Sequence, residues 1–158
     1  MKKLLLLLIV ISAGSSAFSQ TMPAIDGLKL TTGEEYRAAD TIALQVANYI
    51  LATPSDEKST TRLNGTSFLL KWMGGTPDYS FDLDKNVIKY FEKDLDLMGV
   101  YMAALTSSAL QNKTVKDSKS LTSLAAKRFV IYINNPASNV NMTGKLRKLI
   151  EADQKGEL

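Results

Sequence analysis

The chain has 158 residues, with 19 lysines and arginines against 16 acidic residues, and it contains no cysteine and no histidine. The lack of cysteine excludes disulfides and thiol nucleophiles, and the lack of histidine excludes a Ser-His-Asp triad. Zinc sites normally need Cys or His ligands, and no glycine-rich phosphate-binding motif is present. We therefore expect no metal and no cofactor. The chemistry that remains is that of carboxylates, hydroxyls and lysines.

Residues 1–19 have the pattern of a secretory signal peptide. Two lysines at positions 2 and 3 precede the apolar run Leu4–Ile11, and the small residues Ala17 and Ser19 follow. A membrane-spanning helix needs roughly 20 apolar residues, and this run is much shorter. We therefore predict cleavage between Ser19 and Gln20 and a periplasmic or secreted location.

Removal of this predicted signal changes the charge of the chain. The formal net charge is +3, and the signal carries two lysines and no acid, so 17 basic and 16 acidic residues remain. A protein so close to neutral lacks the positive field that binds nucleic acid, so we expect no nucleic-acid partner. The absence of cysteine argues against a lipid anchor, and no later segment is long and apolar enough to span a membrane.

The mature chain is expected to begin with an extended arm, residues 20–31. This segment contains Pro23 and Gly27 and has no helical period. Its apolar side chains, Ile25, Leu28 and Leu30, are expected to hold it on the body of the protein. Residues 32–158 are expected to form a single helical domain, which is long enough to bury a substantial core.

Two helices are predicted in the first half of this domain. Thr32 and Glu35 have capping-box spacing, and an apolar period behind them predicts a helix over 33–52 that ends before Pro54. A second helix is predicted over 60–73. Gly74 and Gly75 are expected to end it, because glycine readily adopts the left-handed conformation found after helix C-termini.

In the second half, residues 76–83 are expected to form an irregular loop packed over the helices. An apolar stripe from residue 87 to residue 109 fits one long helix or two shorter ones. Asp94 and Asp96 favour a break, with helices over 85–92 and 94–112. Further helices are predicted around 121–133, ending at Pro136, and over 143–155, with Thr143 as N-cap and Gly156 as terminator. The predicted fold is all-α: an irregular bundle of five or six helices arranged as antiparallel αα-hairpins.

Three aromatic residues, Trp72, Tyr79 and Phe81, surround the glycines and the proline that follow the second helix. They could form a platform on a loop for a sugar, a peptide or an apolar ligand. The alternative, which we favour, is that Trp72 anchors the core and the loop aromatics pack over it, since aromatics supply much of the burial in small domains. They are nevertheless the preferred ligand-binding candidates, because loops often carry function.

Three acidic residues in the same region, Asp78, Asp82 and Asp84, are the candidate catalytic residues. Asp78 with Asp82 or Asp84 could serve as acid and base in the hydrolysis of a glycan, and Glu92 with Asp96 is a second possible pair. The favoured alternative is that they are ordinary surface acids. Asp82 and Asp84 also begin a D-x-D-x-N pattern, but a calcium loop needs glycine where Val87 stands and glutamate where Lys93 stands.

Four segments carry a resemblance to known proteins. They are Phe68–Phe81, the helix end Tyr49–Pro54, and the later segments Tyr132–Pro136 and Leu149–Asp153. Together they resemble small uncharacterised exported proteins of the Bacteroidota. The resemblance implies an exported helical domain and no particular activity.

The sequence therefore favours an exported, non-enzymatic binding or protein-interaction module whose partner is an envelope protein or a glycan. The alternative is a carboxylate-based hydrolase acting on a glycan. A third hypothesis is a subunit of an envelope assembly. A binding module should show an exposed apolar groove, and an enzyme should show two acids converging in a cleft.

Overall fold

The structure, a computed structural model, describes residues 21–157, and the predicted signal peptide lies outside them. Within this range the chain forms helices and no strand, which confirms the expected all-α bundle. The helices are α1 (Gly33–Ala38), α2 (Asp40–Ala52), α3 (Thr60–Gly75), α4 (Lys85–Ile88), α5 (Leu95–Gln111), α6 (Ser118–Asn134) and α7 (Gly144–Gln154), with a 3-10 turn, η1 (Pro136–Ser138), before α7.

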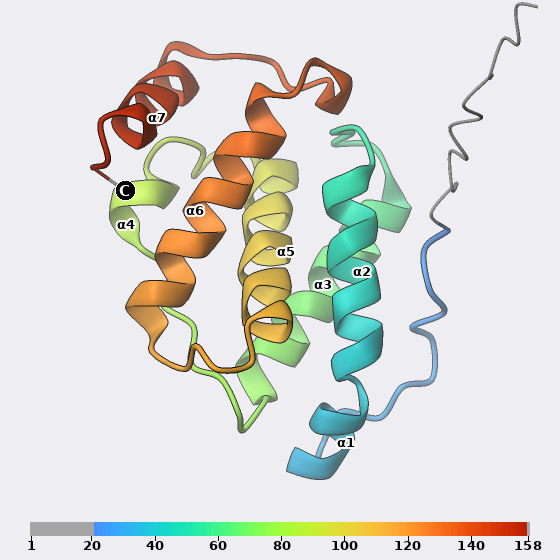
Figure 1. Cartoon of the computed structure of the whole chain (residues 1–158). Coiled ribbons are helices and arrows are strands. Elements are labelled where there is room, and N and C mark those ends of the chain that lie inside the picture. Colours follow the sequence, from blue (N-terminus) through green and yellow to red (C-terminus); the bar gives the residue numbers. More distant parts are fainter. Residues whose placement is uncertain (1–20, 158) are drawn as a thin grey trace, which may run out of the picture.

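Helix α5 lies at the centre of the bundle, with α2, α3 and α6 packed around it (Figure 1). Nearly every side chain from Asp96 to Leu110 is buried. A helix that is buried on all sides needs small or apolar residues around its whole circumference. Gly99 shows how close the packing is, because a Cβ at this position would overlap the side chain of Thr66 in α3.

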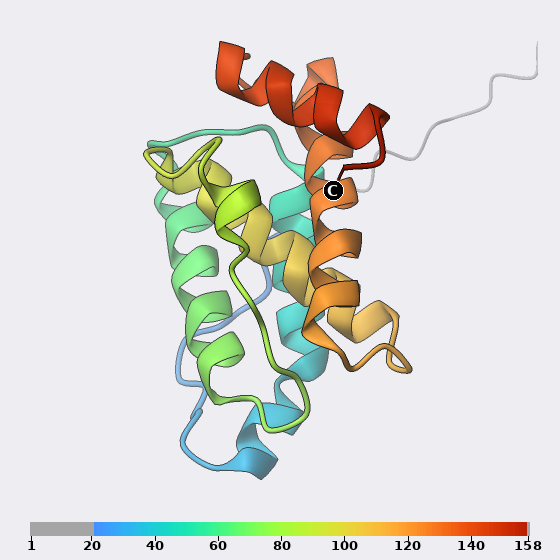
Figure 2. The same ribbon diagram turned by 90° about the vertical axis from the view of Figure 1, so that its left-hand side faces the viewer.

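The two ends of the described chain pack on this bundle. Leu30 of the N-terminal arm is buried, and Ile25 and Leu28 lie against the core, as expected. At the other end, α7 lies across the end of α6 (Figure 2) and buries Leu146 and Leu149. None of the helices in residues 21–157 combines the length and the apolar character that a membrane crossing requires.

Side-chain caps set most of the helix starts. Thr32 and Glu35 make both hydrogen bonds of a capping box, as predicted. The hydroxyl of Thr143 accepts a hydrogen bond from the backbone N–H of Leu146 in the first turn of α7, also as predicted. The predicted helix over 33–52 is divided at Ala39 into α1 and α2. Asp94 caps α5 and separates it from α4, so the stripe belongs to two helices. The first of these, α4, is a single turn and shorter than predicted.

The end of α3 differs from the prediction. The helix continues through both glycines, neither of which is left-handed, and it ends at Thr76. Thr76 is extended because the residue before a proline, here Pro77, disfavours the helical region. Gly75 is required for a different reason: a Cβ at this position would overlap the ring of Tyr36. From this point residues 76–84 run along the bundle to α4 (Figure 2).

Candidate functional site

The three candidate aromatics pack together at the end of α3. Trp72 has no exposed surface, and its indole N–H donates to Oδ1 of Asp40 at 3.1 Å and to the carbonyl of Tyr36 at 3.3 Å. The rings of Tyr79 and Phe81 are half-buried, with centroids 6.2 and 5.8 Å from that of Trp72. Trp72 is therefore a core residue, and a ligand at this surface would contact only the other two rings.

The outer side of this cluster is already partly covered. The ammonium group of Lys116 lies 4.1 Å from the centroid of the Tyr79 ring, within the range of a cation–π interaction. The loop aromatics thus lie between the indole beneath them and a lysine above Tyr79. This arrangement agrees with the favoured interpretation, in which the loop packs over the core.

The candidate catalytic acids do not converge. Asp78 accepts hydrogen bonds from Nε and Nη2 of Arg37 at 3.0 and 3.2 Å, and this pairing lowers the pKa of its carboxyl group. Asp84 caps α4 by accepting from the amide of Asn86 at 2.8 Å. Asp82 and Asp84 line one hollow beside the start of α6, and Asp78 is not among the residues that line it.

A fourth acid, Asp40, was not among the sequence candidates. It is the first residue of α2 and is half-buried beside the Trp72 indole, and burial raises the pKa of its carboxyl group. Acids are common in the first turn of a helix, so its position alone marks it as ordinary. Only the fold reveals that the side chain is covered.

A buried ion pair lies at the start of α3. Arg62 donates from Nε and Nη2 to the two carboxylate oxygens of Asp96, at 2.7 and 3.0 Å, and both side chains are almost fully buried. Ser55 donates to the same carboxylate at 2.6 Å. The remaining guanidinium nitrogen bonds the carbonyls of Ile50 and Thr53 at the end of α2. The pair therefore joins α2, α3 and α5.

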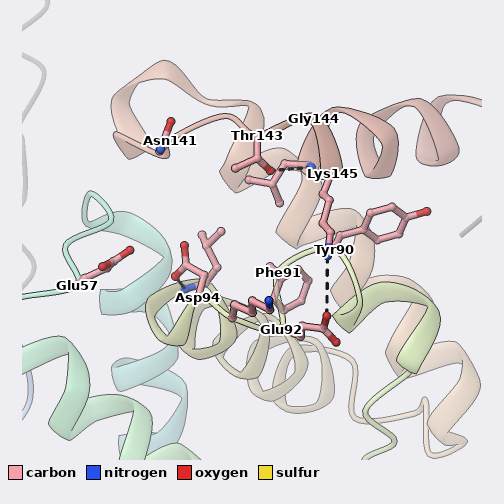
Figure 3. Close-up of a pocket in the computed structure, with 12 residues that line it drawn as sticks. Glu57, Tyr90, Phe91, Glu92, Asp94, Asn141, Thr143, Gly144 and Lys145 are labelled. Atoms are coloured by element: carbon pink, nitrogen blue, oxygen red, sulfur yellow. Dashed lines mark hydrogen bonds and ion pairs between the residues drawn. The ribbon is translucent and has the colours of Figure 1, made fainter.

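A hollow lies between the turn that precedes α5 and the start of α7 (Figure 3). It has a volume of about 480 Å³. Its floor is apolar, since Phe91, Leu97 and Leu146 are buried members of the core. Its rim is polar, formed by Glu57, Tyr90, Glu92, Lys93, Asp94, Asn141, Thr143, Gly144 and Lys145.

Helix caps and one long side chain hold the two sides of this hollow. Thr143 begins α7 on one side, and Asp94 begins α5 on the other. Lys145 extends from α7 across the gap, donating to the carbonyl of Lys89 at 3.4 Å and lying 3.8 Å from Oε1 of Glu92 (Figure 3). Lys145 therefore connects α7 to the turn that precedes α5.

A second hollow, of about 250 Å³, adjoins the first. Glu57 and Lys93 line both, so the two hollows are neighbours, and we name them together the double groove. The second hollow is flanked by two exposed leucines, Leu63 at 57% and Leu95 at 76% exposure. Its remaining lining residues are Asp56, Ser59, Thr66 and Asp96.

The double groove was missed as a surface at the sequence level, although the possible acid pair Glu92 and Asp96 lines it, each acid facing its own cation. Its lining residues come from three separate stretches, 56–66, 90–97 and 141–146. Leu95 belongs to the apolar stripe of residues 87–109, which predicts a buried side chain, whereas the structure exposes 76% of it, so the sequence carried no signal for this surface. In residues 21–157 no group of three or more acidic side chains is placed to hold a metal ion.

Comparison of the chain with protein-family models, with curated proteins and with solved structures finds no match.

Proposed function

We propose that this chain is an exported binding module that acts without catalysis, and that the double groove is its binding surface. The observation that carries the proposal is that a hollow with an apolar floor adjoins a second hollow flanked by two exposed leucines. Large apolar side chains grouped on a surface are characteristic of interaction sites. A concave surface with an apolar base and a few polar groups on its rim is the common form of a ligand site.

The placement of the acids supports binding rather than hydrolysis. A general acid for glycoside hydrolysis needs a raised pKa and a second carboxylate facing the same bond. Asp78 has the opposite property, since Arg37 lowers the pKa of its carboxyl group. Asp84 is engaged in capping a helix. Asp82 and Asp84 share a hollow, but Asp84 accepts the capping hydrogen bond of α4 there, so we give the binding role preference over hydrolysis.

Export is the second part of the proposal, and its support is the signal pattern in residues 1–19. The test is to produce the full chain in a bacterial host and to determine the N-terminus of the protein found in the envelope or medium. We expect a form that begins at Gln20. A full-length protein that stays in the cytoplasm would refute export.

The binding surface can be tested with a photo-crosslinking amino acid placed in the exported protein. Position Lys93 lines both hollows, and position Lys127, exposed on α6, provides a matched control. We expect a discrete adduct from position 93 that is absent from position 127 and is lost in a Leu95→Ser variant. The same adducts from both positions would rule out the double groove as the binding surface.

A further inference from the structure

We infer that the double groove binds an extended, apolar segment of another protein that carries lysine or arginine side chains. This inference deepens the proposed function and rests on it, because it names the chemistry of the partner at the same surface. Its support is the adjacency of the two hollows, the exposed leucines and the charge of the rim.

The shape of the surface favours an elongated occupant. The two hollows, of about 480 and 250 Å³, meet at Glu57 and Lys93. Leu95 belongs to the second hollow, and Leu97, two residues further along α5, belongs to the first. A compact ligand would fill one hollow and leave the other in water. An extended peptide can place side chains in both.

The apolar surface favours a protein partner over a glycan. Leu63 and Leu95 are aliphatic and expose 57% and 76% of their surface. Covering such side chains gives about 25 cal/mol for each Å² of apolar surface removed from water, and this gain requires apolar groups on the partner. The hydroxyl groups of a sugar would leave much of this gain unrealised.

The charge of the rim specifies basic residues in the occupant. Among the described residues that line the double groove, Asp56, Glu57, Glu92, Asp94 and Asp96 are acidic and Lys93 and Lys145 are basic. Two of the acids already face a cation, since Asp96 pairs with Arg62 and Glu92 with Lys145. The remaining charged lining residues are three acids and one lysine, namely Asp56, Glu57, Asp94 and Lys93. This excess of negative charge favours a basic partner.

The experiment is selection from a phage library of random 12-residue peptides against the exported, mature protein, with counter-selection against a Leu95→Ser variant. We expect the selected peptides to be enriched in both large apolar and basic residues. For a synthetic copy of one of them, Leu95→Ser and Glu57→Lys should each weaken binding about tenfold, a typical effect for an important interface residue. Binding should also weaken as salt is raised.

Matched controls come from exposed residues elsewhere. Ile131 is 71% exposed on α6, and Glu151 is exposed on α7. The substitutions Ile131→Ser and Glu151→Lys should leave the peptide affinity unchanged. Circular dichroism should show the same helical signal for all four variants, because every substituted side chain is on the surface.

Three results of the peptide experiments would overturn the inference. They are the absence of any peptide enriched over the library, enrichment of peptides without basic residues, and equal loss of affinity in the control variants. A dimer of the mature protein that Leu95→Ser dissociates would make a second copy the occupant and would also overturn it. If the inference fails but Lys93 still crosslinks to a glycan in cells, the proposed binding function stands. Failure of export or of crosslinking, with peptide selection still successful in vitro, would refute the proposed function and leave only a peptide affinity of the double groove.

Discussion

The two ends of α3 carry the same interaction in opposite surroundings. Arg62 and Asp96, at its start, form two hydrogen bonds at 2.7 and 3.0 Å, and their side chains are 3% and 6% exposed. Arg37 and Asp78, beyond its other end, form two at 3.0 and 3.2 Å, with side chains 52% and 34% exposed. The hydrogen-bond geometry of the two pairs is therefore nearly equal. Their different burial should decide how strongly the loss of each pair changes the free energy of unfolding.

Burial also gives the two ends different tasks. At the start of α3, the Arg62 guanidinium contacts the end of α2 and the hydroxyl of Tyr132 in α6 as well as Asp96 in α5. Because Asp96 also lines the second hollow, this pair supports the base of the double groove. At the other end, Trp72 is covered by its own loop, and the ion pair lies outside it. The double groove and the buried Arg62–Asp96 pair therefore lie at the same end of α3.

The largest effect is expected from Asp96→Ala. This variant leaves the Arg62 guanidinium buried without its counter-ion, which should lower the free energy of unfolding by about 3–5 kcal/mol. Urea denaturation followed by circular dichroism measures it. The paired variant Arg62→Met with Asp96→Leu is the control, and it should be more stable than Asp96→Ala because no uncompensated charge remains. A loss no larger than that of Asp78→Ala would break the comparison between the two pairs.

The next effect concerns the glycines at the end of α3. Gly75→Ala should destabilise the protein by about 1–3 kcal/mol, because the new methyl group meets the ring of Tyr36. Gly74 is an exposed neighbour in the same helix with no described atom within 4 Å of an added Cβ. Gly74→Ala should therefore stabilise by up to about 1 kcal/mol through helix propensity. Thermal unfolding of both variants tests this, and equal midpoints would show that the contact with Tyr36 is unimportant.

Most of the fold could be predicted because its signals are local. The capping box at Thr32, the N-cap at Thr143 and the apolar periods each lie within a few residues of the helix they define. The error at Gly75 arose because the residue that needs the glycine, Tyr36, lies in another helix. Local sequence could not show this contact.

The functional surface could not be predicted for the same reason. Arg62 and Asp96 are 34 positions apart, and the two hollows combine three distant stretches of chain. The aromatic candidates were closer in sequence, and the structure places Trp72 in the core with the two loop rings over it. Residues close in sequence therefore indicated how the core packs, whereas the candidate site is formed by residues that only the tertiary fold brings together.

A smaller, pH-dependent effect is expected at Asp40, beside the Trp72 indole. Burial raises the pKa of this carboxyl group in the folded state, so its contribution to stability is full below the unfolded pKa of about 3.9 and is lost as pH rises through the folded pKa. The substitution Asp40→Asn keeps a side-chain oxygen that can accept from the indole N–H. It removes the carboxyl group, and with it the loss of stability that accompanies ionisation. The variant should therefore gain stability relative to the wild type as pH rises from about 3.9 through the raised folded pKa. Urea denaturation across this range measures it, and parallel pH profiles would show that burial of the carboxylate has no cost.

The smallest effect is expected from Asp78→Ala, which removes the exposed pair. The Arg37 guanidinium lowers the pKa of Asp78, so any contribution to stability is present at neutral pH and is lost as pH falls through that lowered pKa. Both side chains are largely in water, where solvent and salt screen the attraction and ordering two long side chains opposes it. The unfolding midpoint at neutral pH should match that of the wild type and that of Asp82→Ala, a control at another exposed acid. A clear loss confined to Asp78→Ala, and removed by high salt, would show that an exposed pair can contribute measurably in this protein, and burial alone would no longer separate the two ends of α3.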